Sequence, residues 1–185
     1  IETINNIENN DWLARAIEML LTLAVKDKKL NDGEIKAVAQ RALVGGKPQA
    51  LYMACVVFAE DNLVMPALRC FLKITNTPYV FSAIPAMKKL MEGKETKFDA
   101  KLLPVINSEY QPIEKEPSTF LELFYAAKGQ WVIGNIDEAI KLITRAINEF
   151  TVPFKQALEV YVFAVAISGN DRMKTEIAQQ LKAKY

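Results

Sequence analysis

The chain has 185 residues, of which 51% are hydrophobic and 24% charged, so it can bury enough apolar surface to fold. Its 23 basic and 22 acidic residues nearly cancel, which leaves no strong field to attract nucleic acid or an acidic membrane surface. The longest apolar runs, 50–59 and 160–167, are much shorter than the roughly 20 residues that cross a bilayer. We therefore expect neither a nucleic-acid-binding protein nor a membrane-spanning one.

The start of the chain and its two cysteines bear on its compartment. The sequence does not open with methionine, so we expect that its N-terminus has been trimmed. It does not open with a signal-like segment either, so we expect a cytoplasmic protein. The alternative is that the missing part carried a signal or an anchor. Cys55 and Cys70 lie in apolar stretches and are predicted to be reduced core residues. The alternative for them is one bridge between neighbouring helices in an oxidising compartment.

Apolar residues recur mostly at spacings of three and four, which predicts helix nearly throughout and an all-α fold. The first helix is expected to bury one stripe, made of Trp12, Ala16, Met19, Leu20 and Leu23. Ten helices are predicted in chain order, over residues 11–25, 34–44, 48–60, 64–74, 79–91, 98–107, 119–132, 137–150, 154–167 and 172–184.

Glycine, proline and capping residues set the boundaries of these helices. Gly45 and Gly46 end the second helix, Pro48 opens the third, and Ser118 or Thr119 caps the seventh. Pro85 and Pro104 conflict with the pattern, because an interior proline costs about 3 kcal/mol and kinks or breaks a helix.

The stretch 108–117 contains two prolines and three glutamates without an apolar period, which predicts a loop. We expect a single helical-repeat domain over 1–185, with possible sub-blocks 11–107 and 118–185 on either side of this loop.

The predicted turns recur at a regular interval. Asn62, Gly134 and Gly169 each follow the first helix of a predicted pair, at separations of 72 and 35 residues. These are about two and one times the length of a helix-turn-helix repeat, and such pairs must stack on neighbours to bury their apolar faces. The sequence therefore predicts about five antiparallel helical pairs stacked as an α-solenoid.

One predicted pair, 120–153, resembles a tetratricopeptide repeat. The family's pattern has, in order, a small residue, a turn residue, an aromatic residue, an alanine, a large apolar residue and a second alanine. The residues at these places are Ala127, Gly134, Ile136, Ala139, Ile143 and Ala146. The pair 48–78 is similar through Leu51, Cys55, Asn62, Val64, Ala67, Phe71 and Ile74. The chain departs from the family where Leu51 and Leu123 replace an early large aromatic residue. The resemblance implies a tetratricopeptide-like or Sel1-like solenoid; another right-handed helical repeat and a compact bundle stay open.

In such a solenoid the first helix of each pair lines a concave groove that holds a peptide or a helix of a partner protein. Matching the pattern residue by residue places nine side chains in this groove: Gln49, Tyr52, Val56, Phe124, Lys128, Trp131, Gln156, Glu159 and Phe163. Aromatic anchors beside a few charged groups suit peptide capture, in which a handful of residues carry most of the binding energy.

Catalysis and metal binding lack their usual residues. The sequence contains no histidine, the commonest general base and transition-metal ligand, and its two cysteines lack zinc-site spacing. We therefore expect no catalytic residue, no metal and no cofactor, and a scaffold or adaptor that works within a larger assembly. The alternatives are a chaperone of the secretion type, which shields its cargo, and a helical enzyme or small-ligand-binding protein.

Overall fold

The computed structural model describes residues 10–27, 31–92, 115–168, 178–180 and 182–183. Within these ranges the regular structure is helical and contains no strand, which confirms the predicted all-α class. The chain divides into two compact units, residues 1–115 and 116–185, and the division falls within the predicted loop 108–117. None of the described helices has the length and apolar character needed to cross a bilayer.

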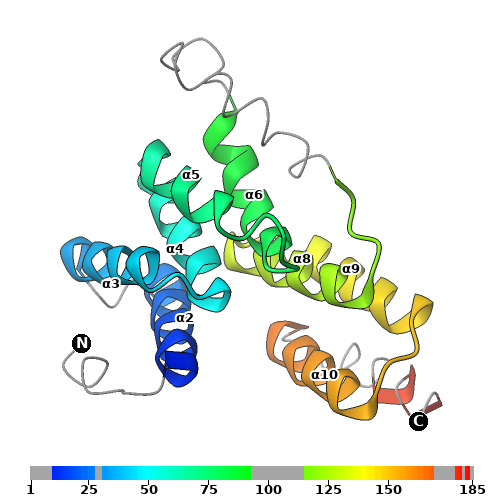
Figure 1. The fold of residues 1–185 in the computed structure, drawn as a ribbon. Coiled ribbons are helices and arrows are strands. Elements are labelled where there is room, and N and C mark those ends of the chain that lie inside the picture. Colours follow the sequence, from blue (N-terminus) through cyan, green and yellow to red (C-terminus); the bar gives the residue numbers. More distant parts are fainter. Residues whose placement is uncertain (1–9, 28–30, 93–114, 169–177, 181, 184–185) are drawn as a thin grey trace. The chain divides into compact units, whose positions relative to one another are not determined.

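The first unit is arranged around one apolar helix. Its helices are α2 (Asn10–Asp27), α3 (Asp32–Gly45), α4 (Pro48–Glu60), α5 (Val64–Leu72) and α6 (Val80–Met91). The α4 helix packs against each of the other four (Figure 1). It is therefore surrounded, and every residue from Ala50 to Ala59 is buried, as expected for a helix that is apolar on all sides.

The buried face of α2 differs from the predicted one. The side chains that enter the core are Ala14, Ile17, Leu21 and Ala24, each at most 3% exposed. Three residues of the predicted stripe, Trp12, Met19 and Leu23, are instead 64%, 67% and 51% exposed. The helix has apolar residues on several sides, and the side that carries two alanines allows the closer approach to α3 and α4. Periodicity alone could not choose between these sides.

The α6 helix continues through Pro85, in agreement with the predicted helix 79–91, although an interior proline conflicts with the helical pattern. Proline at this position has no N–H to donate to the carbonyl of Phe81, four residues earlier. The segment 80–87 is nonetheless buried throughout. Tertiary packing of an apolar helix outweighs a local preference of this size, so the helix persists at the cost of one backbone hydrogen bond.

The second unit contains α8 (Phe120–Val132), α9 (Ile136–Glu149) and α10 (Phe154–Ser168). The α8 and α9 helices form a hairpin, and α10 packs against α9. The facing surfaces rely on small residues, since Ala127, Ala139, Ala146 and Ala164 are at most 1% exposed in the shared core. Large apolar residues such as Ile143 fill the space between these close contacts.

The hairpins α4–α5 and α8–α9 have matching features at an offset of 72 residues. The α8 helix begins and ends 72 residues after α4, and α9 begins 72 residues after α5. Their turn residues Asn62 and Gly134 both have positive φ, 59° and 88°. The backbone hydrogen bonds also match: Leu63 N–H donates to Phe58 O and Asn135 N–H to Gln130 O, both at 2.8 Å.

The buried contacts of the two hairpins share this offset. Five matched pairs of residues are each 0% exposed, namely Leu51 and Leu123, Cys55 and Ala127, Ala67 and Ala139, Phe71 and Ile143, and Ile74 and Ala146. These are positions at which the sequence pattern of the two segments agrees. Two hairpins with little identity are thus built on one local plan.

Some predictions fall on residues outside the described ranges. These are the helix 98–107 with Pro104, most of the loop 108–117, the turn at Gly169, and most of the helix 172–184, of which 178–180 and 182–183 are helical. Elsewhere the predicted and observed helix bounds differ by at most two residues, and those of α4 agree.

Candidate functional site

The predicted groove residues of α8 lie on one side of a firmly started helix. Thr119 caps α8 by accepting a hydrogen bond from Glu122 N at 3.3 Å, while the Glu122 carboxylate accepts one from Thr119 N at 3.1 Å. This reciprocal arrangement fixes where the helix begins and therefore which residues share a face. Phe124, Lys128 and Trp131 follow at spacings of four and three, so they form one stripe.

Phe163 of α10 meets this stripe. Its ring lies edge-on to Phe124, with 5.6 Å between centroids and an interplanar angle of 82°. It also lies edge-on to Trp131, at 5.4 Å and 88°. Such T-shaped pairs are favourable by about 0.5–1.5 kcal/mol beyond their buried area. We call Phe124, Lys128, Trp131 and Phe163 the aromatic face.

The exposure of the aromatic face is graded. Phe124 is 8% exposed and belongs to the core, whereas Trp131 and Phe163 are partly buried and pack against that core. The two outer rings thus combine a fixed position with surface open to solvent. A partner could cover the remaining surface without first ordering these side chains, which lowers the entropic cost of binding.

Lys128 supplies a cation to the aromatic face. Its Nζ lies 5.5 Å from the centroid of the Phe124 ring and 5.7 Å from that of Tyr125. A cation in this range is attracted by the negative face of an aromatic ring. The amine is therefore held next to the apolar rings, where it could also meet an acidic group of a bound polypeptide.

The remaining predicted residues of α10 lie on the side that carries Phe163. Gln156 and Glu159 precede it by seven and four residues, so all three share a helix face. Gln156 is partly buried and Glu159 is exposed. The second unit therefore gathers the four aromatic-face residues and places two polar ones along the same side of α10.

The first unit does not offer its predicted groove residues in the same way. Gln49 is partly buried, but Tyr52 and Val56 are 2% and 0% exposed. Tyr52 is covered because its hydroxyl donates a 2.6 Å hydrogen bond to Glu18 of α2 and its ring stacks with Tyr79, 6.1 Å away. The prediction that Tyr52 and Val56 line an open groove is therefore corrected: helices on either side of α4 enclose them.

No family model matches the sequence. Comparisons with curated proteins and with solved structures also found no match. The resemblance to tetratricopeptide repeats consequently depends on this chain's own residues and on the repeated hairpin geometry. Within the described part of the chain, no three cysteine, aspartate or glutamate side chains gather in a way that could hold a metal ion.

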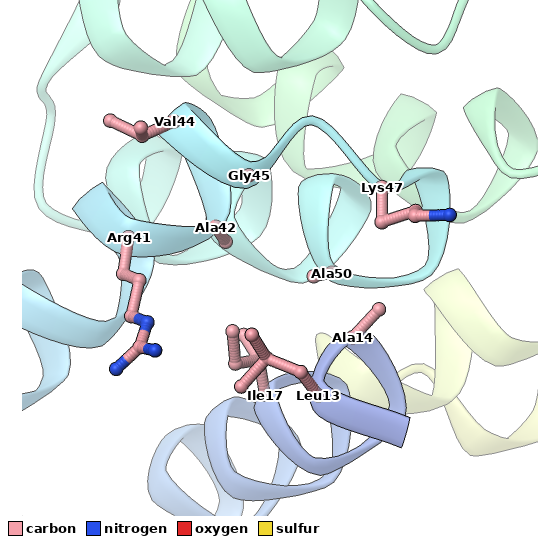
Figure 2. A pocket seen from close by; sticks show the side chains of 9 residues that line it. All are labelled: Leu13, Ala14, Ile17, Arg41, Ala42, Val44, Gly45, Lys47 and Ala50. Carbon is pink, nitrogen blue, oxygen red and sulfur yellow. The ribbon is translucent and has the colours of Figure 1, made fainter. Parts of the chain in front are cut away.

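The first unit contains a pocket that the sequence did not predict. It has a volume of about 240 Å³ and lies between the first half of α2 and the turn from α3 to α4 (Figure 2). Its lining is mainly apolar, with Arg41 and Lys47 as the two charged residues: Leu13, Ala14, Ile17, Arg41, Ala42, Val44, Gly45, Lys47 and Ala50. The only sequence signal was the Gly45–Gly46 turn, because the other wall comes from residues about 30 positions earlier.

The two cysteines are poor candidates for nucleophilic chemistry. Both are free and buried, in agreement with their prediction as reduced core residues. Burial raises the pKa of the Cys55 thiol well above its ordinary value, and the neighbouring Cys70 raises it further. Burial also raises the pKa of Cys70 to about 12, against an opposing effect of Lys73. Because the thiolate is the reactive form, both side chains are inert near neutral pH.

Proposed function

We propose that this chain is a non-catalytic helical-repeat adaptor whose second unit binds a peptide or a helix of a partner protein on the aromatic face. The observation that carries the proposal is the meeting of Phe163 with both Phe124 and Trp131. The repeat pattern assigned these residues to one groove although Phe163 lies more than 30 positions from Trp131 in the sequence.

The repeated hairpins support the architectural part of the proposal. A 72-residue offset corresponds to two repeats of about 36 residues, close to the length of a tetratricopeptide repeat. The matched turns at Asn62 and Gly134 and the matched alanine-sized contacts are what a stack of similar hairpins requires. In such a stack the first helices of successive pairs are neighbours, as α8 and α10 are at Phe163.

The chemistry of the aromatic face indicates the kind of partner. Trp131 and Phe163 would contact apolar side chains, and tryptophan is among the residues most enriched where single side chains dominate binding. Lys128 would pair with an acidic residue of the bound segment. We therefore propose a polypeptide that combines an apolar anchor with a nearby carboxylate, held by part of a helical face rather than by a closed pocket.

The proposal is tested by affinity purification of the full chain from its native cell, followed by mass spectrometry. Three versions are compared: the unchanged chain, Trp131→Ala and Ile136→Ala. Ile136 is a matched apolar control, since it is 44% exposed at the start of α9 and lies outside the aromatic face. We expect Trp131→Ala to lower recovery of a specific partner at least about tenfold, as loss of a dominant contact does.

Stability is measured alongside recovery, so that loss of binding is not confused with unfolding. Each variant should retain the helical circular-dichroism spectrum of the unchanged chain. A second variant, Lys128→Glu, should weaken recovery of the same partner by reversing the charge beside the rings. Equal recovery from Trp131→Ala and Ile136→Ala, with both folded, would refute the proposed role of the aromatic face.

A further inference from the structure

The size and lining of the pocket in the first unit restrict what it can hold. At about 240 Å³ it is smaller than the roughly 300–1,000 Å³ of common small-molecule sites. A cavity of about 150 Å³ accepts one benzene ring, so this pocket suits one bicyclic aromatic side chain. Figure 2 shows Leu13 and Ile17 directed toward Ala42 and Ala50, which leaves an apolar slot between α2 and the start of α4.

The charged residues at the pocket also favour an aromatic occupant. Arg41 and Lys47 lie on either side of the slot (Figure 2). Lys47 donates a 2.9 Å hydrogen bond to Asp11 at the start of α2, which holds this cation beside that helix. Cations beside an apolar slot attract the face of an indole ring more strongly than that of the other aromatic side chains.

Such a ring lies next to the pocket on the same surface. Trp12 is 64% exposed and immediately precedes Leu13, which lines the pocket, yet Trp12 is not itself a lining residue. Successive residues of a helix point about 100° apart, so the ring and the pocket occupy neighbouring sides of α2. The guanidinium of Arg15 already lies 5.6 Å from the centroid of the Trp12 ring.

We propose that two copies of this chain associate through α2, with Trp12 of each copy inserted into the pocket of the other. A two-fold axis requires one patch that complements itself, and this patch contains both a projecting ring and a slot of suitable size. Met19 and Leu23, 67% and 51% exposed, lie seven and eleven residues after Trp12 on the same side of the helix and would be covered by the same contact. The inference lies in the first unit and does not rest on the proposed function of the second.

Sedimentation equilibrium of the full chain over a range of concentrations measures the association. We expect a monomer–dimer equilibrium whose Kd rises at least about tenfold in Trp12→Ala, since each dimer loses two buried rings. Met65→Ala is the matched control, because Met65 is a large apolar residue of the same unit, 38% exposed on α5. Its Kd should equal that of the unchanged chain.

The pocket is tested from its other side with Gly45→Leu. A Cβ added at Gly45 meets no atom within 4 Å, and the backbone there is not in the left-handed region, so the residue can be enlarged without strain. Leu13→Phe is a second way to narrow the slot, since Leu13 is directed into it (Figure 2). Both variants should weaken the homodimer while circular dichroism shows an unchanged fold.

Mixing the two kinds of variant distinguishes ring insertion from general stickiness of α2. Trp12→Ala keeps an open pocket without a ring, and Gly45→Leu keeps a ring without an open pocket. Their mixture forms one complete contact, whereas each homodimer forms none. Native mass spectrometry of an equal mixture should therefore find heterodimer well above the twofold excess over each homodimer that random pairing gives. The proposal would be overturned if the chain stays monomeric at all concentrations or if Trp12→Ala dimerises like Met65→Ala. It would also be overturned if the mixture contains no more heterodimer than random pairing gives.

Discussion

Replacing Tyr52 tests whether this side chain of α4 belongs to the core of the first unit or lines an open groove. The ring is 2% exposed, stacks with Tyr79 and bonds to Glu18 through its hydroxyl. Truncating a buried aromatic side chain to alanine costs about 3–5 kcal/mol, so Tyr52→Ala should lower the free energy of unfolding by that amount. In a protein of this size, this corresponds to a fall in Tm of about 6–20 °C.

Tyr52→Phe separates the hydroxyl from the ring. A hydrogen bond to a charged group contributes about 1.5–3 kcal/mol, but Glu18 is only partly buried and water can replace the lost donor. We expect a loss of about 1–2 kcal/mol, measured by urea unfolding followed by far-ultraviolet circular dichroism. Met65→Ala, at an exposed position of the same unit, should cost less than about 1 kcal/mol. If Tyr52→Ala costs no more than this control, the enclosed position of Tyr52 is refuted.

Two further predictions concern the turn of the second hairpin and the buried thiols. Gly134→Ala should lower the free energy of unfolding by about 1–2 kcal/mol, because Gly134 has a φ of 88° that a residue with a Cβ rarely adopts. Gly134→Asn should cost less, because Asn62 adopts a positive φ at the matching turn of the first hairpin. Gly45→Ala, at a glycine without positive φ, is the control, and all three variants are compared by urea unfolding. Burial raises the pKa of Cys70 to about 12 in the folded chain, against 9.0 when it is unfolded. The unfolded chain therefore releases this proton at lower pH, and the free energy of unfolding should fall as pH rises from about 9 toward 12. This fall should be smaller in Cys70→Ala. An equal fall in the free energy of unfolding of the unchanged chain and of Cys70→Ala would contradict the raised pKa of Cys70.

Local sequence signals predicted the helices well because local chemistry determines their ends. Pro48 begins α4, Thr119 and Glu122 begin α8, and Asn62 and Gly134 take the left-handed conformation between paired helices. Each feature depends on residues within about four positions of one another. The same is true of the stripe formed by Phe124, Lys128 and Trp131, so that part of the candidate site was predictable.

Features that depend on distant residues were not predictable in the same way. Which side of α2 is buried depends on α3 and α4, and Tyr52 is enclosed by Glu18 and Tyr79, which lie 34 and 27 positions away along the chain. The helix through Pro85 persists because its surroundings bury it. The pocket needs α2 and the turn after α3 together, so no single segment of the sequence reveals it.

The chain's two tryptophans fall one in each compact unit, Trp12 in the first and Trp131 in the second. Their surroundings differ, since Trp12 is mostly exposed while Trp131 lies against the Phe163 ring. Intrinsic fluorescence can therefore follow each half of the molecule separately once the other indole is replaced by phenylalanine. The protein carries its own pair of reporters for whether its halves unfold as one cooperative system or in succession.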